Sequence, residues 1–166
     1  MIEFLDHAVI WNALSPELRD ELYLEIFPEL DSTNQYALHR ATAPCFACLA
    51  EFQTQGRGRQ GKQWISPVGS GLCLSLKYCY PTTAFPQVGL NLALALTVAK
   101  LLRSLGASEV GVKWPNDIGW KNRKLAGLLL ETRLTANRYE VVLGIGLNIQ
   151  MPETVAIDQA WVDLQT

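Results

Sequence analysis

The sequence predicts one ordered domain that contains both α-helices and β-strands. Its length of 166 residues is typical of a single domain with a real core. Hydrophobic residues make up 49% of the chain and charged residues 18%, a balance that favours a compact soluble protein over a disordered one. Apolar runs of strand character alternate with segments of helical periodicity, and no repeat interrupts them.

Three segments have helical periodicity. Short helices are predicted near residues 3–13 and over 35–40, separated from each other by a turn at Ser15-Pro16 and by a strand. The long apolar segment 84–105 predicts a core helix, with Gly106 at its C-terminal end.

Seven segments have strand character. Pro115 cannot continue a ladder, so the strand before it should end in a turn that displays Lys113, Asn116 and Asp117. The expected strands are 22–27, 45–52, 72–78, 110–114, 118–120, 124–134 and 138–148, of which the last three form consecutive hairpins.

The segment 53–67 departs from any hydrophobic pattern and contains three glycines, three cations and no acid. Glycines let backbone N–H groups approach a ligand closely, and Arg and Lys supply charge, so a phosphate or carboxylate is the expected guest. The segment also matches G-x-G-x-x-G, but a dinucleotide fingerprint needs a helix at its third glycine and an acidic residue about 20 positions later. Neither is present, which leaves a solvated surface loop as the alternative to an anion site.

The charge distribution supports a local anion site. The net charge of −2 does not indicate a nucleic-acid-binding face. Half of the 14 Lys and Arg residues nevertheless lie in 53–64 or 113–124. This concentration favours a small anionic ligand.

The four cysteines predict no metal site. Cys45 and Cys48 form a C-x-x-C pattern, but residues three apart on a strand point to opposite faces, and no second pair completes a zinc site. We interpret the cysteines as buried, reduced and structural, which indicates a cytoplasmic protein. There is no signal peptide, and the apolar stretch 88–105 carries Asn91, Lys100 and Arg103, so no membrane association is expected.

Two further groups of residues are candidates for binding. Asp31, Ser32, Thr33 and Asn34 precede a helix, where one side chain would cap the helix and the others could bind a neutral polar ligand. Period two places Gly144 and Gly146 on one face of a strand as bare backbone, with Gly127 and Leu129 as candidates for the same groove. Lys124 has the opposite parity and could reach this groove only from a turn.

No nucleophile with an adjacent base is evident, and His7 and His39 lie in ordinary helical contexts. A carboxylate needs no general base to attack the α-phosphorus of a nucleoside triphosphate, because it is already a nucleophile at neutral pH. It needs neutralised repulsion and alignment, which Arg and Lys provide. Acyl-adenylate formation therefore fits these residues.

The motifs together resemble the catalytic domain of biotin protein ligases. The resemblance runs in order from about Leu5 to the end of the chain. It rests on Asp31-Ser32-Thr33-Asn34, Gln53 with Gly56-Arg57-Gly58-Arg59-x-Gly61-x-x-Trp64-x-Ser66-Pro67, Lys113-Trp114-Pro115-Asn116-Asp117, Lys124-Leu125-Ala126-Gly127 and Gly144-x-Gly146-x-Asn148.

The resemblance implies a reaction of two steps and a set of roles. Biotin and ATP, the latter with Mg²⁺ held by phosphates and water, give biotinyl-adenylate, and the biotinyl group then passes to a lysine of the biotin carboxyl carrier protein of acetyl-CoA carboxylase. The implied catalytic residues are Lys124, Arg59, Lys113 and Asp117. The implied biotin-binding residues are Ser32, Thr33, Asn34, Gln53, Arg57, Gly58, Arg59, Lys124, Gly127, Leu129, Gly144 and Gly146, and the implied adenylate-binding residues are Trp64, Asn116 and Asn148.

The resemblance also implies an α+β fold with a mixed β-sheet and helices mainly on one face, as in lipoate ligases and class II synthetase cores. A homodimer would form through sheet edges. Residues 1–166 are expected to be the catalytic domain without the late helices, without the C-terminal SH3-like barrel and without an N-terminal winged helix, hence with no nucleic-acid partner. A lipoate or octanoate ligase and a biotin-binding module without transfer activity are the alternatives.

Overall fold

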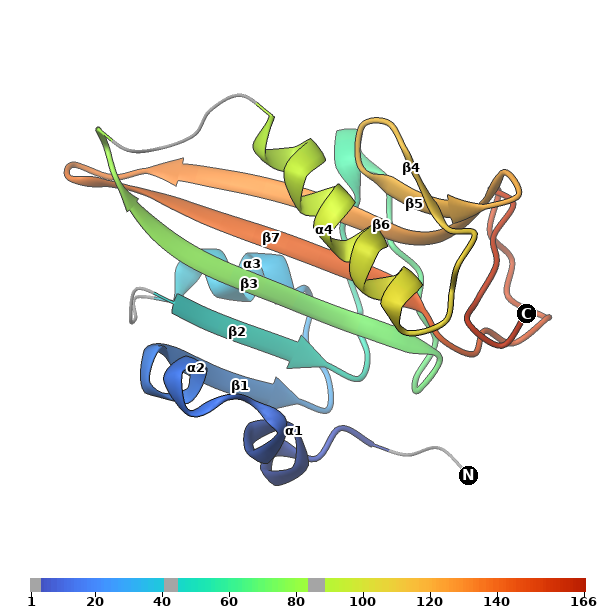
Figure 1. The fold of residues 1–166 in the computed structure, drawn as a ribbon, viewed down its shortest axis with the longest axis horizontal. Coiled ribbons are helices and arrows are strands. Elements are labelled where there is room, and N and C mark those ends of the chain that lie inside the picture. Colours follow the sequence, from blue (N-terminus) through green and yellow to red (C-terminus); the bar gives the residue numbers. More distant parts are fainter. Residues whose placement is uncertain (1–3, 41–44, 84–88) are drawn as a thin grey trace.

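The computed structural model describes residues 4–40, 45–83 and 89–166, and its main feature is one seven-stranded sheet (Figure 1). The strand order is β1-β2-β3-β7-β6-β5-β4. β1 and β2 are parallel, and every other neighbouring pair is antiparallel. The elements in chain order are α1 (His7–Ala13), α2 (Pro16–Glu21), β1 (Leu22–Phe27), α3 (Thr33–His39), β2 (Cys45–Ala50), the 3₁₀-helix η1 (Arg59–Gly61), β3 (Gly71–Pro81), α4 (Leu90–Ser104), β4 (Gly111–Lys113), β5 (Asp117–Trp120), β6 (Arg123–Leu134) and β7 (Arg138–Asn148).

Of the four α-helices in the described residues, three cover the same face of the sheet. α4 buries Ala95, Ala99 and Leu102 against strands β5, β6 and β7. α1 and α2 lie over β1, where Ile10 and Trp11 pack on apolar residues of β1 and β2. This arrangement confirms the expected α+β fold with a mixed sheet and helices mainly on one face.

α3 lies alone on the opposite face. It buries Ala37 against Phe46 and Cys48 of β2 and Val142 of β7. Residues paired across antiparallel strands share a face, so the partners Ser75 and Gly144 lie on this side as well. The face that carries α3 is therefore the one toward which the predicted glycine groove opens.

The two N-terminal helices differ from the expectation. α1 begins at His7, because Asp6 caps it by accepting hydrogen bonds from the N–H groups of Ala8 and Val9. Ser15-Pro16 does not form a simple turn. Ser15 is the N-cap of α2, and Pro16 is tolerated at the first helical position because its missing N–H would be unpaired there.

The remaining elements agree with the predicted order. β1 and β7 have the predicted bounds, and β5 and β6 each begin one residue earlier than predicted. The predicted helix 84–105 is observed as α4, while residues 84–88 lie outside the described part of the chain, as does residue 3 at the start of the first predicted helix. Gly106 has a φ of +108° after α4, as expected for a C-terminal glycine.

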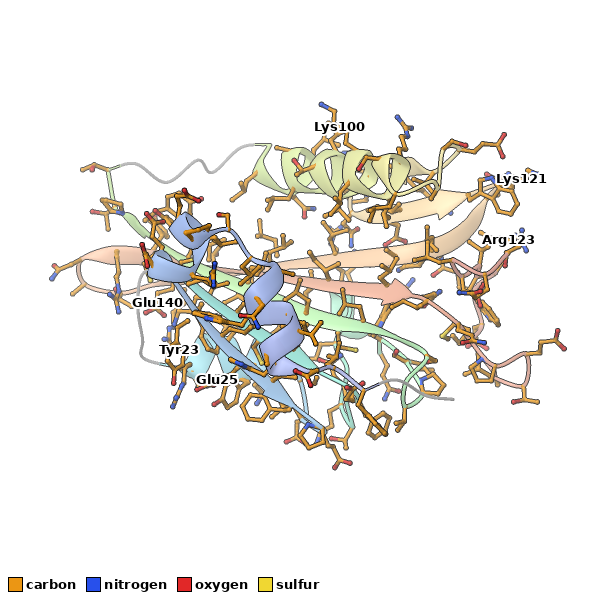
Figure 2. All side chains as sticks on the ribbon, turned by 60° about the horizontal axis from the view of Figure 1, so that its bottom comes forward. Tyr23, Glu25, Lys100, Lys121, Arg123 and Glu140 are labelled. Carbon is orange, nitrogen blue, oxygen red and sulfur yellow. The ribbon has the colours of Figure 1, made fainter. Side chains whose placement is uncertain are left out.

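The two ends of the sheet carry different charged groups. Figure 2 shows Lys121 and Arg123 at the tip of the β5–β6 hairpin, and Glu140 near the start of β7 at the opposite end of the sheet.

Within the described residues, no helix has the length and apolar character that a membrane crossing requires.

Candidate functional site

Of the polar residues at the start of α3, Ser32 caps the helix, while Thr33 and Asn34 bond to other segments of the site. Ser32 caps α3, since its Oγ accepts from the N–H of Gln35 at 3.4 Å. Thr33 donates from both its N–H and its Oγ1 to Gln53 Oε1, at 2.8 and 3.1 Å. The side chain of Asn34 points onto the sheet, where Nδ2 donates to the carbonyl of Leu129 at 3.2 Å. Ser32, Thr33 and Asn34 all line the pocket described below.

The predicted groove of bare backbone is present on β6 and β7. Gly127 is paired with Gly146, and Leu129 with Gly144, so all four residues share one face. A Cβ on Gly144 would lie 2.2 Å from Asn34 Oδ1, and one on Gly146 would lie 2.3 Å from the Trp64 ring. Glycine is therefore required at both positions because neighbouring side chains occupy the space above them.

A β-bulge brings Lys124 to this face. Ile118 pairs with Ala126 and the next residue, Gly119, pairs with Lys124, so β6 has one extra residue, Leu125. The bulge sends both Leu125 and Ala126 into the core and shifts the parity of Lys124 by one. The Lys124 ammonium consequently lies 3.2 Å from the Cβ position of Gly127. The expectation that only a turn could bring Lys124 to the groove is wrong for this reason.

Segment 53–67, which we call the Gly/Arg loop, folds back on itself above the groove. The N–H of Gly58 donates to the carbonyl of Lys62 at 2.7 Å, and the N–H of Trp64 donates to that of Gly56 at 2.9 Å. No α-helix opens at Gly61, which excludes a dinucleotide fingerprint. Two contacts favour a loop that is docked on the site over one that is only solvated: Arg59 Nη1 donates to Asn116 Oδ1 at 2.9 Å, and the Trp64 ring lies over Gly146.

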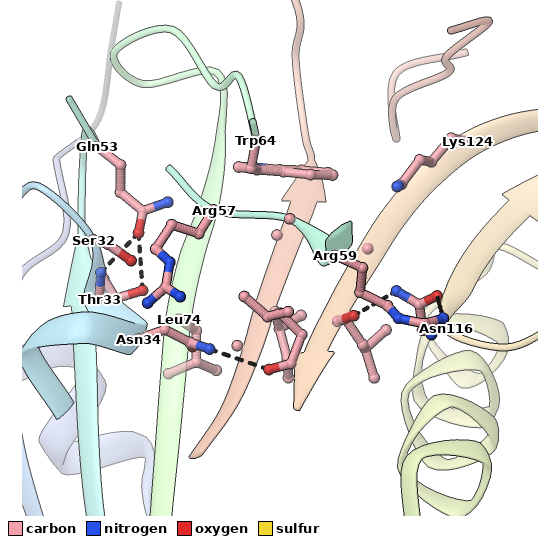
Figure 3. Close-up of a pocket in the computed structure, with 17 residues that line it drawn as sticks. Ser32, Thr33, Asn34, Gln53, Arg57, Arg59, Trp64, Leu74, Asn116 and Lys124 are labelled. Atoms are coloured by element: carbon pink, nitrogen blue, oxygen red, sulfur yellow. Dashed lines mark hydrogen bonds between the residues drawn. The ribbon is translucent and has the colours of Figure 1, made fainter. Parts of the chain in front are cut away.

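These segments enclose one pocket (Figure 3). Lys124 lies beside Trp64, with its Nζ 5.5 Å from the ring centroid and 2.9 Å from Asp117 Oδ1. The cavity measures about 50 Å³ in this conformation. Its lining includes all the predicted biotin-binding residues and two of the predicted adenylate-binding residues, namely Ser32, Thr33, Asn34, Gln53, Arg57, Gly58, Arg59, Lys124, Gly127, Leu129, Gly144, Gly146, Trp64 and Asn116.

Three predicted residues do not line this pocket. Asp117 forms an ion pair with Lys124, which does line the pocket. Lys113 is exposed at the end of β4, where it is the β-ladder partner of Asp117 on β5. Asn148 is buried, and its amide donates to the carbonyls of Lys124 and Val162 at 3.3 and 3.0 Å.

The C-terminal segment forms part of the surroundings of Lys124. The N–H of Lys124 donates to the carbonyl of Ala160, and the N–H of Val162 donates to that of Lys124, both at 2.9 Å. A second depression on this side is lined by Gln63, Trp64, Ile65, Lys124, Asn148, Ile157, Gln159 and Trp161. The sequence pattern fades after Pro152, which is why this contribution was not predicted.

Two polar residues of the site were also missed. Ser75 is fully buried, with its Oγ 2.8 Å from Thr33 Oγ1 and 2.6 Å from Asn34 Oδ1. The sequence does carry a signal for Ser75. It is a hydroxyl residue within an apolar strand, and it lies on the same face of β3 as the buried residues Cys73 and Lys77. Glu131 accepts hydrogen bonds from Asn34 and Arg57, and no motif pointed to it.

The expectation of buried cysteines holds for Cys48 and Cys73, whereas Cys45 and Cys79 are half-buried, and all four are free thiols. Cys45 packs with the core under α1 and Cys48 with the core under α3, on opposite faces of β2. Burial raises the pKa of Cys48 to about 12 and that of Cys73 to about 11, so both thiols stay protonated and unreactive. Within the described residues, no group of three or more His, Cys, Asp or Glu could hold a metal ion.

Comparison with known proteins identifies the family. The model of the biotin/lipoate A/B protein ligase family matches residues 26–148. The chain belongs to this family. The predicted resemblance is thereby confirmed.

Individual relatives of this family are biotin ligases. The chain is 42% identical over 145 residues to the bifunctional ligase/repressor BirA of Escherichia coli (strain K12), covering 84% of this chain and 45% of the relative. It is 43% identical over 169 residues to BirA of Salmonella typhimurium, covering 99% of this chain and 51% of the relative. The chain thus spans about half the length of the curated relatives it matches.

A solved structure supports the same family. The biotin protein ligase from Aquifex aeolicus in complex with biotin and ATP superposes with a TM-score of 0.71 at 29% identity, covering 85% of this chain and 59% of that chain. The family fold therefore extends over most of the described sheet.

Proposed function

We propose that this chain carries the adenylating site of a biotin protein ligase. The observation that carries the proposal is the position of Lys124, which the bulge places beside a groove of bare glycine backbone and within 2.9 Å of Asp117. The relatives named above are ligases, and the Aquifex aeolicus enzyme was solved with biotin and ATP. ATP and biotin are accordingly the proposed substrates.

The first step joins two anions. An oxygen of the biotin carboxylate attacks the α-phosphorus of ATP, a new O–P bond forms, and the bond to pyrophosphate breaks. The ammonium of Lys124 neutralises the repulsion between these groups, and Asp117 orients it. In this proposal Mg²⁺ is bound by the ATP phosphates and water. Among the described contacts, Asp117 is the only carboxylate beside Lys124, and it is already paired with the Lys124 ammonium.

The polar and apolar parts of the pocket suit the two ends of biotin. Ser32, Thr33, Asn34 and Gln53 offer donors and acceptors for a neutral ureido head. The glycine face of β6 and β7 admits a slender apolar tail. The indole N–H of Trp64 is buried without a hydrogen-bond partner in the described part of the chain, which leaves a donor for the adenylate.

In the second step, the amine of an acceptor lysine attacks the acyl carbon of biotinyl-adenylate. An amide bond forms, the acyl C–O bond breaks, and AMP leaves. We infer that the acceptor is the biotin carboxyl carrier protein of acetyl-CoA carboxylase, because relatives in Mycobacterium tuberculosis and Paracoccus denitrificans are named biotin--[acetyl-CoA-carboxylase] ligases.

ATP–pyrophosphate exchange tests this proposal. We expect exchange by the 166-residue chain that depends on biotin and does not respond to lipoate. Exchange driven by lipoate would favour the lipoate ligase alternative. Exchange without labelling of a carrier lysine would restrict the chain to the first step, and absence of biotin-dependent exchange would refute the proposal.

A further inference from the structure

Two arginines of the Gly/Arg loop bridge it to neighbouring segments above the groove, in addition to the side-chain bonds of Gln53 and Thr54 at its base. Arg59 donates to Asn116 at 2.9 Å on the side of the β4–β5 turn. Arg57 Nη2 lies 2.8 Å from Glu131 Oε1 on the side of α3. The first bridge joins two residues of the predicted site, whereas Glu131 has no assigned role.

Glu131 connects the loop to the polar end of the pocket. It lies on β6 with the same parity as Gly127 and Leu129, so its side chain rises on the site face. Its second oxygen, Oε2, accepts from Asn34 Nδ2 at 2.9 Å. One carboxylate thus fixes both Arg57 of the loop and Asn34 of α3.

Glu131 itself does not line the pocket. Its effect on a ligand must therefore pass through the two residues it holds. The cavity of about 50 Å³ is small beside the roughly 300 Å³ or more of typical ligand pockets, so the loop has to move outward for a bicyclic ligand to bind. Residues 56–64 of the loop are closed by their own backbone hydrogen bonds, whereas the N–H groups of Thr54 and Gln55 donate to the carbonyls of Leu30 and Asp31. The closed part can therefore move as one unit about this base.

We propose that Glu131 is a positioning residue that holds Arg57 across the polar end of the pocket and thereby sets how much of the time the Gly/Arg loop is closed. The bond is charge-assisted and only partly exposed, with 20% of the Glu131 side chain accessible. Loss of the charge shifts the loop toward open conformations. Ligand retention then falls.

Limited trypsin digestion of the full chain measures loop opening directly. The loop contains three cleavage sites, after Arg57, Arg59 and Lys62. Glu131→Gln keeps the size and one oxygen of the side chain but removes the charge. Cleavage after Lys77, whose side chain is 1% exposed, reports global unfolding in the same samples.

Glu25→Gln is a matched control. Glu25 of β1 pairs with Arg40 at 2.5 Å and accepts from the Tyr36 hydroxyl at 2.7 Å, so it also holds one arginine and one neutral donor. The side-chain exposures of the two pairs are similar, at 40% and 15% against 44% and 20%. The two variants remove the same kind of ion pair from different places.

We expect Glu131→Gln to be cleaved in the loop about threefold to tenfold faster than the wild type, the range for losing a partly exposed charge-assisted bond. Glu25→Gln should be cleaved there at the wild-type rate. Equal loop cleavage in the two variants, or an increase in Glu131→Gln that is matched at Lys77, would overturn the proposal.

A double-variant cycle keeps the test decisive if Glu131→Gln is poorly folded. Arg57→Gln removes the same ion pair from the other side and leaves the sites after Arg59 and Lys62 readable. If the two residues act through each other, Arg57→Gln should open the loop equally and the double variant should open it no further. Independent, additive increases would contradict a shared role.

Part of this inference rests on the proposed function, namely the prediction that biotinyl-adenylate dissociates faster from Glu131→Gln by a similar factor. The digestion experiment requires no ligand. Faster loop cleavage in a protein without biotin-dependent exchange would leave the role of Glu131 intact and refute the proposed function. Unchanged cleavage with normal exchange would do the reverse.

Discussion

A single extra residue in β6, Leu125, sets the position of the Lys124 ammonium. We expect Lys124→Ala to lose about 2–4 kcal/mol of transition-state stabilisation, because one preorganised contact to a developing anion is of this size. Biotin-dependent ATP–pyrophosphate exchange measures the loss. Lys121→Ala at the hairpin tip is the control, since Lys121 stacks on Trp120 at 4.2 Å and is exposed. Equal rates in the two variants would argue against Lys124.

Gly144 requires bare backbone because Asn34 is fixed above it. A Cβ would lie 2.2 Å from Asn34 Oδ1, and Asn34 cannot withdraw while it bonds Ser75, Leu129 and Glu131. We expect Gly144→Ala to lower the free energy of unfolding by about 1–3 kcal/mol, the usual effect of overpacking.

Urea denaturation of Gly144→Ala beside Gly111→Ala would check this expectation. Gly111 has nothing within 4 Å of its Cβ position and its φ is not positive, so alanine there should be neutral or slightly stabilising. A stability for Gly144→Ala as high as that of Gly111→Ala would show that Asn34 can move aside.

At this scale the sequence predicts residue types better than their contacts. The glycines and cations of the pocket stand out because a core or an ordinary loop does not explain them. The parity of Lys124 was misjudged because a bulge leaves no signature in the hydrophobic pattern. Glu131 was missed because a carboxylate near a strand end looks like an ordinary surface residue until Arg57 is placed beside it.

Among the elements, β3, β6 and β7 are joined by a charge network around the buried Glu140 and Lys77, away from the pocket. Glu140 of β7 pairs with Lys77 of β3 at 3.4 Å and with Arg133 of β6 at 2.5 Å. Lys77 also donates to the carbonyl of Arg40 after α3 at 2.7 Å. The network therefore ties the helix on the site face to the strands beneath it.

This network should make stability depend on pH. Burial alone would raise the pKa of Glu140, but hydrogen bonds from Arg133 and the charges of Lys77 and Arg133 outweigh burial and hold that pKa below its ordinary value of 4.5. A lowered pKa in the folded state contributes stability above pH 4.5, which is lost as the pH falls through the folded-state value.

Glu140→Gln tests the contribution. At pH 7 the variant leaves Lys77 buried without its counter-charge, so we expect a loss of about 3 kcal/mol in the free energy of unfolding. Below pH 4.5 the wild type loses its own contribution and the two proteins should converge. Denaturation curves between pH 7 and pH 3 measure the difference. A constant difference across this range would show that Glu140 does not titrate as described.

The prediction of elements succeeded where a local pattern and tertiary packing agree. The hairpin strands are apolar runs bounded by short polar turns, so their bounds were nearly correct. α2 was missed because Ser15-Pro16 is compatible with both a turn and a helix start, and the helix is stabilised by its position on β1. A six-residue helix has too few turns for its periodicity to be recognised from sequence alone.

At the scale of the whole molecule, the pocket is assembled from segments that lie far apart in the chain. α3, the Gly/Arg loop, the β4–β5 turn, and strands β6 and β7 each supply part of its lining. Each segment carries a motif that the sequence shows, but their convergence follows only from the strand order, which places β7 between β3 and β6. The sequence therefore predicted the parts of the site and needed the family resemblance to bring them together.

The C-terminal segment is the part of the assembly for which no motif exists, and its removal gives the sharpest test of the whole arrangement. Val162 is buried in the core under α4, and backbone bonds at Ala160 and Val162 hold Lys124 from outside the sheet. Deletion of residues 157–166 should leave every predicted catalytic residue in the chain and still reduce biotin-dependent exchange by about tenfold or more, because a misplacement of about 1 Å has this order of effect. Deletion of residues 164–166 keeps Ala160 and Val162 and should retain both exchange and thermal stability. If the longer deletion exchanges as fast as the shorter one, the position of Lys124 is set by β6 alone, and the backbone bonds of the C-terminal segment do not contribute to the reaction.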